Sequence, residues 1–135
     1  MNVLVDTSVW SLALRRARRV DDTVPRELAA LIHEGRVLLI GAVRQELLSG
    51  IKSKPQFEQL CEHLRAFPDL ELDFHDYEDA AAAYNRCRER GIQGSNSDFL
   101  ICAVAIRREL AIFTTDGDFK QFARALRFEL HQPRA

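Results

Sequence analysis

Short apolar runs alternate with amphipathic segments along this chain, and the alternation constrains the fold more than any other feature. Residues 2–5, 37–40 and 111–115 are rich in branched aliphatic side chains. Between them, apolar residues recur every three or four positions, which is the spacing of one helix face. Strands separated by helices are typical of a parallel sheet covered on both faces. The sequence therefore predicts an α/β fold.

The remaining segments are assigned by the same periodicities and by their capping residues. Helices are predicted over residues 7–14, 25–34, 42–49, 55–67, 76–90, 98–108 and 118–126, with Asp76 and Asp98 at the start of their helices and Tyr77, Ala80, Ala81, Tyr84, Cys87, Phe99, Ala103 and Ile106 facing inward. Two further strands are predicted, an edge strand at residues 70–72 and a last strand at residues 127–130. No linker interrupts the pattern, so residues 1–135 are interpreted as one domain.

Charge and cysteine content exclude several classes of protein. Lys and Arg number 19 against 20 Asp and Glu, for a formal charge of −1, which excludes a globally basic nucleic-acid binder but allows a local basic patch. Cys61, Cys87 and Cys102 are widely spaced and predict structural thiols rather than a metal cluster. No apolar run is long enough to span a membrane, so we expect a cytoplasmic protein.

Four carboxylates follow predicted strands or open the next helix, where parallel sheets bind ligands. They are Asp6, Glu46, Asp98 and Asp116. Each also has a plain structural interpretation, as a helix cap, a solvated helix residue, a first-turn acid or part of a turn. Carboxylates that converge repel one another unless a cation lies among them, and an all-oxygen set suits Mg²⁺ or Mn²⁺. Such an ion would polarise a phosphoryl oxygen and orient water, as in metal-dependent nucleases.

The segments around these acids form a set that occurs in a known family. VLVDTSVW, RQELLSGI, GIQGSNSDFLICAVAI and IFTTDGDF resemble, in order and spacing, the four acidic motifs of PIN-domain ribonucleases, and most closely those of VapC-type toxins of toxin–antitoxin pairs. The resemblance covers essentially the whole chain. It implies a three-layer α/β/α fold with a five-stranded parallel sheet. It also implies an endoribonuclease that depends on Mg²⁺, for which Mn²⁺ would substitute, and that is neutralised by a cognate antitoxin and forms a homodimer.

Carried over residue by residue, the resemblance assigns roles to the acids. Asp6, Glu46, Asp98 and Asp116 would form the catalytic site, with Asp6 and Asp98 as the first choice of direct metal ligands, Asp116 as a further ligand and Glu46 completing the cluster. Ser8 and Thr114 stand where the family places a hydroxyl that bonds the carboxylates or the scissile phosphate. Asp118 is an additional acid of the site or the N-cap of the last helix.

Basic residues and two rival functions complete the expectations. Arg15, Arg16, Arg18 and Arg19, with Lys52 and Lys54, would line an RNA path through phosphate contacts or form a solvated surface. No role is assigned to Arg86, Arg88 and Arg90, which do not share one helix face. The rivals are a non-catalytic PIN-like module that binds RNA or protein, and a haloacid-dehalogenase-like phosphatase. The phosphatase needs a second acid two positions after Asp6, where this chain has Ser8.

Overall fold

A three-stranded parallel sheet forms the centre of the computed structural model, which describes residues 1–14 and 21–134. β1 (Val3–Val5) lies between β2 (Val37–Leu38) and β3 (Ala111–Phe113). Val3 pairs with Val37 on one side and with Ala111 on the other. The side chains of β1 are fully buried, because a central parallel strand is covered on both faces. The α/β prediction is confirmed.

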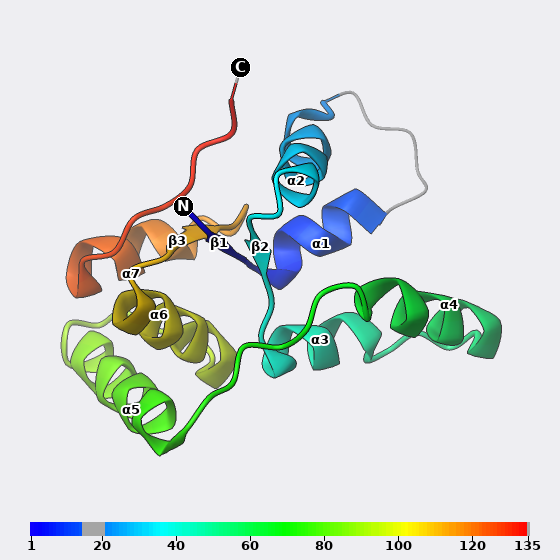
Figure 1. Cartoon of the computed structure of the whole chain (residues 1–135). Helices are drawn as coiled ribbons and strands as arrows, with labels where there is room; N and C mark the ends of the chain where they lie inside the picture. The colour runs from blue at the N-terminus through cyan, green and yellow to red at the C-terminus, as the bar shows by residue number, and fades with distance from the viewer. Residues whose placement is uncertain (15–20, 135) are drawn as a thin grey trace.

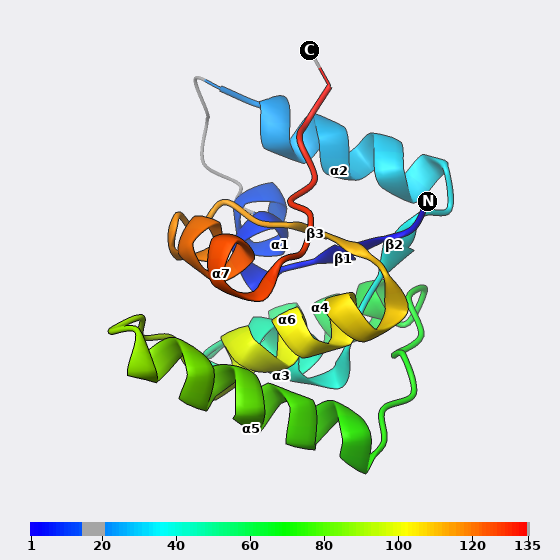
Figure 2. The same cartoon turned by 90° about the vertical axis from the view of Figure 1, so that its left-hand side faces the viewer.

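Helices cover both faces of the sheet. In the described part of the chain they are α1 (Thr7–Leu14), α2 (Thr23–His33), α3 (Gly41–Leu48), α4 (Lys54–Leu64), α5 (Phe74–Glu89), α6 (Asn96–Arg108) and α7 (Asp118–Leu126) (Figure 1). Figure 2 shows α2 on one side of the sheet and α6 on the other, with α5 packed outside α6. None of the helices described is long and apolar enough to cross a membrane.

The prediction of five strands is wrong for the described residues. Where the fourth and fifth strands were expected, the structure has single parallel bridges, from Leu39 to Asp69 and from Ile112 to Leu130. Each bridge lies on the outer side of a flanking strand. The chain passes the sheet edge there, but the backbone hydrogen bonds do not repeat to form a strand.

Two predicted features of α5 are also corrected. The N-cap is Asp73 rather than Asp76, which is the third helical residue and completes a capping box with Asp73. Asp76 is fully buried and accepts a hydrogen bond of 2.6 Å from Arg108 of α6. Tyr77 is 56% exposed rather than inward, because the face that packs inward is formed by Ala80, Ala83 and Cys87. Ala81 is likewise exposed.

The core is aromatic at the α6–α7 junction. Three phenylalanines there are almost completely buried, Phe99, Phe119 and Phe122. The ring of Phe122 contacts Phe99 at a tilt and Phe119 edge to face. Cys87 and Cys102 are buried free thiols, and burial raises the pKa of the Cys102 thiol, which makes it unreactive. Ile106, predicted inward on α6, is partly exposed.

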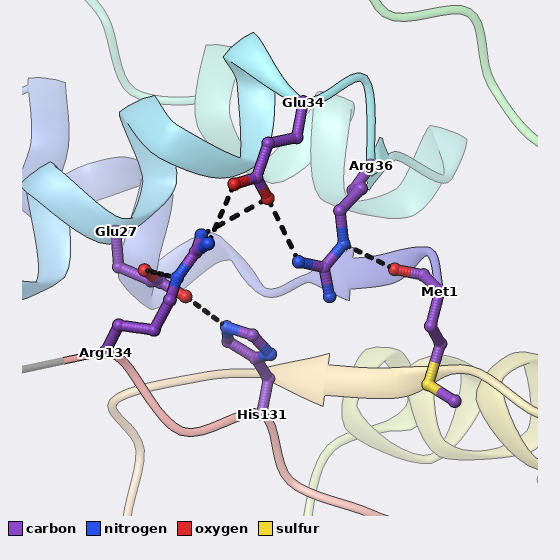
Figure 3. A network of polar contacts seen from close by, with 6 residues as sticks. All are labelled: Met1, Glu27, Glu34, Arg36, His131 and Arg134. Atoms are coloured by element: carbon purple, nitrogen blue, oxygen red, sulfur yellow. Dashed lines mark hydrogen bonds and ion pairs between the residues drawn. The ribbon is translucent and has the colours of Figure 1, made fainter.

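Both ends of the chain are tied to α2 and the turn that follows it. Glu27 accepts hydrogen bonds from Arg134 at 3.0 Å and contacts His131 at 2.5 Å, and Arg134 also bonds Glu34. Arg36 bonds Glu34 and donates to the carbonyl of Met1. Figure 3 shows this terminal network, defined by Met1, Glu27, Glu34, Arg36, His131 and Arg134. The network runs along the α2 side of the sheet, from Met1 before β1 to His131, whose ring contacts Phe113 at the carboxyl end of β3, so it ties α2 to both ends of the chain.

Candidate active site

Asp6 stands at the carboxyl end of the central strand and is 6% exposed. Its backbone N–H donates to the carbonyl of Phe113 at 2.9 Å, which continues the β1–β3 pairing by one residue. Its carboxylate oxygen Oδ2 accepts hydrogen bonds from the hydroxyls of Ser8 and Thr114, both at 2.8 Å. The first predicted acid is therefore held by a hydroxyl from each of two chain segments.

The segment after β3 is fixed by hydrogen bonds from its own backbone. The N–H of Thr115 donates to Ser8 Oγ and the N–H of Asp116 donates to Thr114 Oγ1, each at 3.0 Å. The carboxylate of Asp116 in turn accepts the N–H of Asp118 at 2.9 Å. This turn places Asp116 next to the group formed by Asp6, Ser8 and Thr114, and α7 begins after it. Asp118 is exposed and is the first residue of α7, whereas the N-cap is Gly117.

Asp98 lies in the first turn of α6 rather than at its start. Ser95 is the N-cap, and the two residues form a capping box. The Ser95 N–H donates to Asp98 Oδ2 at 3.0 Å, and the Asp98 N–H donates to Ser95 Oγ at 3.1 Å. The cap fixes the side chain of Asp98, which is half-buried, and the positive end of the helix dipole favours a negative charge there.

The pKa values of Glu46 and Asp98 show that the acids share one electrostatic environment. Burial raises the pKa of Glu46, and the negative charges of Asp6 and Asp98 raise it further. Burial also raises the pKa of Asp98, and the charges of Asp6 and Asp116 add to the shift against the opposing hydrogen bonds from Ser95. The four predicted acids come from α3, α6 and the ends of β1 and β3, and each one acts on at least one other.

The donor chemistry of this cluster suits a hard divalent cation, because its ligating atoms are all oxygens and none of the four acids forms an ion pair within residues 1–14 and 21–134. The hydroxyl oxygen of Thr7, next to Asp6, is buried and has no hydrogen-bond partner among the described residues. Within residues 1–14 and 21–134, however, no three His, Cys, Asp or Glu side chains form a ready ligand group. The acids are neighbours through their charges, and binding an ion requires carboxylates to turn toward it.

Sequence reasoning missed three polar residues at this site. Ser95 caps α6 and holds Asp98, while the side chains of Thr7 and Ser97 adjoin Glu46. The pattern Ser-x-x-Asp before an apolar run is a capping-box signature that could have found Ser95. No comparable signal exists for Ser97, because its role depends on the fold bringing the start of α6 near Glu46 of α3.

Only some of the basic residues predicted to contact RNA lie in the described part of the chain. Arg15, Arg16, Arg18 and Arg19 lie outside the described residues. Lys52 and Lys54 are exposed where α3 connects to α4, and neither forms an ion pair with a described residue. Their predicted role stays a prediction.

Comparison with known proteins adds to this geometry. A family model described as the PIN domain matches residues 3–125. Ribonuclease VapC11 of Mycobacterium tuberculosis is 30% identical over 126 residues, which cover 90% of this chain and 92% of that protein. The structure is also similar to VapBC2 of Rickettsia felis bound to a promoter DNA fragment (TM-score 0.77, 19% identity, 97% and 98% of the two chains) and to a toxin–antitoxin complex of Klebsiella pneumoniae (TM-score 0.63, 19% identity, 87% and 90%). At these identities the structures show the fold alone.

Proposed function

The chain belongs to the PIN domain family and, within it, to the VapC ribonucleases, and from this premise we propose that it is a metal-dependent endoribonuclease that acts as the toxin of a toxin–antitoxin pair. The observation that carries the proposal is the acidic cluster at the carboxyl edge of the sheet. Burial raises the pKa of Glu46 and Asp98 there, and the charges of neighbouring acids add to both shifts. An anionic pocket of this kind is suited to one or more divalent cations and, through them, to a phosphodiester.

Within this proposal each acid has a part. Asp6, Asp98 and Asp116 would hold Mg²⁺, or Mn²⁺ in its place, and Glu46 would orient water beside them. The bound ion supplies charge stabilisation to the phosphoryl oxygens and lowers the pKa of water. Ser8 and Thr114 keep Asp6 in position, because both hydroxyls donate to its Oδ2. Asp118 is exposed and holds Asp116 only through its backbone N–H, so we assign it no direct contact with the ion.

The proposed partners are an RNA substrate, a cognate antitoxin protein and a second copy of the chain, and the proposed location is the cytoplasm. The similar structure from Klebsiella pneumoniae is a toxin–antitoxin complex, which supports an antitoxin partner here. Tyr77 is 56% exposed beside a hollow of about 410 Å³ that α5 and α6 line with Ala80, Tyr84 and Leu100. Asn85, Asn96 and Ser97 also line this hollow, so the second copy of the chain is proposed from the family resemblance and not from this surface.

The ribonuclease function is tested with Asp98→Asn, which keeps the size of the side chain and removes its charge. Purified wild-type protein is expected to cut RNA in the presence of Mg²⁺ or Mn²⁺. It is expected not to cut RNA when EDTA removes the metal. Asp98→Asn is expected to lose at least about 100-fold in cleavage rate, because a direct metal ligand is removed. Asp79→Asn, an exposed acid on α5, serves as the control and should cut like the wild type. Equal cleavage by Asp98→Asn and the control would instead favour the non-catalytic module.

A further inference from the structure

An arginine-lined hollow of about 390 Å³ lies between the end of α5, the loop that follows it and α7. Its lining residues are Arg90, Ile92, Gln121, Arg124 and Ala125, and we call it the arginine hollow. Arg90, Gln121 and Arg124 are exposed. Neither arginine forms an ion pair with a described residue, and no acidic side chain is among those that line the hollow. Its two guanidinium groups are therefore available to an anion.

The two chain segments that line the arginine hollow adjoin the acidic cluster, one at Asp98 and the other at Asp116. Arg90 starts the loop that reaches Ser95, whose backbone and side chain hold Asp98. Gln121 and Arg124 belong to α7, which begins at Asp118 just after Asp116. A Cβ added at Gly94 would come within 2.6 Å of the Phe122 ring, so the loop and α7 pack tightly together. The hollow and the acidic cluster are built on the same two segments.

Lys120 extends the positive surface toward the acids. It is exposed and lies one helical turn before Arg124, about 6 Å closer to the amino end of α7. Side chains four residues apart share a helix face, so Lys120 and Arg124 point to the same side. Asp116 lies four residues before Lys120, at the same end of α7. Positive charge thus follows α7 from the hollow to the cluster.

We propose that the arginine hollow binds the phosphate backbone of the RNA substrate on one side of the cleavage site, with Arg90 and Arg124 as the contacting groups. The proposal rests on the ribonuclease function and adds the path by which the strand reaches the acids. A guanidinium group donates two hydrogen bonds to a phosphate in a fixed geometry. A polar hollow with two unpaired guanidinium groups fits a phosphodiester better than an apolar protein segment. Arg90, which the sequence pattern left without a role, acquires one from its neighbour on α7.

The test measures binding of a fluorescent single-stranded RNA as a function of salt, on an Asp98→Asn background that leaves the RNA intact. Arg90→Ala/Arg124→Ala is compared with Arg26→Ala/Arg65→Ala, which removes two exposed arginines outside the hollow. Each lost phosphate contact lowers the slope of log K against log salt by about 0.7. The hollow variant is therefore expected to lose about 1.4 from the slope and to bind at least tenfold more weakly in low salt, while the control double variant behaves like the parent. Circular dichroism checks that both variants are folded.

Cleavage assays separate this proposal from the ribonuclease function. With Asp98 restored, the hollow variant should show a raised KM for RNA relative to the control variant. Wild-type protein that cuts no RNA would contradict the ribonuclease function, and the binding measurement decides on the hollow in either case. Salt slopes and KM values equal to those of the control would overturn the proposal. Retained RNA binding with lost affinity for an oligoglutamate peptide would also overturn it, and would assign the hollow to an acidic protein segment.

Discussion

The hydrogen bonds of Asp6 determine which of its two carboxylate oxygens can bind an ion. Ser8 and Thr114 each accept a backbone N–H, from Thr115 and Asp116 respectively. Each hydroxyl then has its one proton left. Asp6 Oδ2 lies 2.8 Å from both hydroxyl oxygens, which are 3.2 Å from each other, so the shorter contacts favour donation of both protons to Oδ2. Oδ2 is thereby occupied, so Oδ1 is the oxygen that Asp6 presents to an ion. Neither hydroxyl has a proton to give to a phosphate while it holds Asp6.

This arrangement predicts the effect of removing one hydroxyl. Thr114→Val keeps the shape of the side chain but leaves Asp6 Oδ2 with one donor and the Asp116 N–H without an acceptor. Loss of a residue that orients a metal ligand costs about 10- to 100-fold in metal affinity or activity. We expect a rise of that size in the Mn²⁺ concentration needed for half-maximal cleavage. Thr114→Ser restores the hydroxyl and should recover most of the affinity. A Mn²⁺ requirement that is the same in Thr114→Val and wild type would refute the positioning role.

The junction of α6 and α7 depends on one glycine. An ideal Cβ on Gly94 would lie 2.6 Å from Phe122 Cζ and 3.0 Å from Phe99 Cε2. Both rings are buried in the core and have no free space to move into. The loop before α6 can therefore approach α7 this closely only without a side chain.

Gly94→Ala is expected to lower the free energy of unfolding by about 1–3 kcal/mol, as overpacking in a core does. Gly117→Ala is the matched control, because nothing lies within 4 Å of its added Cβ and its φ of −60° suits any residue. That variant should be neutral or gain about 0.5 kcal/mol. Urea denaturation of the two proteins measures the difference. Equal urea midpoints for the two glycine variants would contradict the predicted overpacking at Gly94.

Elements with a strong local signal could be predicted from the sequence, and elements that depend on distant partners could not. The helix Asp118–Leu126 is confirmed at both ends, because its apolar residues and flanking Gly117 lie within one short window. The sequence predicts Asp76 as the cap of α5, whereas the structure has Asp73 there and Asp76 two residues into the helix after Phe74. The contact of Asp76 with Arg108, 32 residues away, explains its burial and is invisible to local reasoning. The acids were picked out by position after strands, while the Ser97–Glu46 proximity comes from packing alone.

At the scale of the whole molecule, the acidic residues after the strands and the acids of the terminal network have opposite electrostatic surroundings. At the carboxyl edge, burial raises the pKa of Glu46 and Asp98, and the charges of neighbouring acids raise both values further. The terminal network pairs its acids with Arg36 and Arg134, and hydrogen bonds from these two arginines lower the pKa of Glu34 to about 2. The acids of the site repel one another, which destabilises the fold there. The terminal network offsets this by fixing both chain ends.

Glu27 is the buried member of the terminal network, and it predicts how stability depends on pH. Burial raises its pKa, but hydrogen bonds with His131 and Arg134 outweigh burial, so the net pKa lies below the ordinary value of 4.5. A carboxyl whose pKa is lowered on folding contributes stability above its unfolded pKa and loses it as the pH falls through the folded value. Glu27→Gln should therefore lower the free energy of unfolding by about 1–2 kcal/mol at pH 7.

The difference between Glu27→Gln and wild type should shrink as the pH falls below 4.5, because Glu27 is protonated first in the unfolded chain, and it should vanish once the pH also falls through the lowered pKa of native Glu27. Urea denaturation at pH 7, 5, 4 and 3 measures it. Glu62→Gln, an exposed acid on α4, should match the wild type at each of these pH values, which separates the network from a general effect of charge. A Glu27→Gln deficit that stays constant from pH 7 to pH 3 would mean that shape rather than charge holds the C-terminal segment against α2.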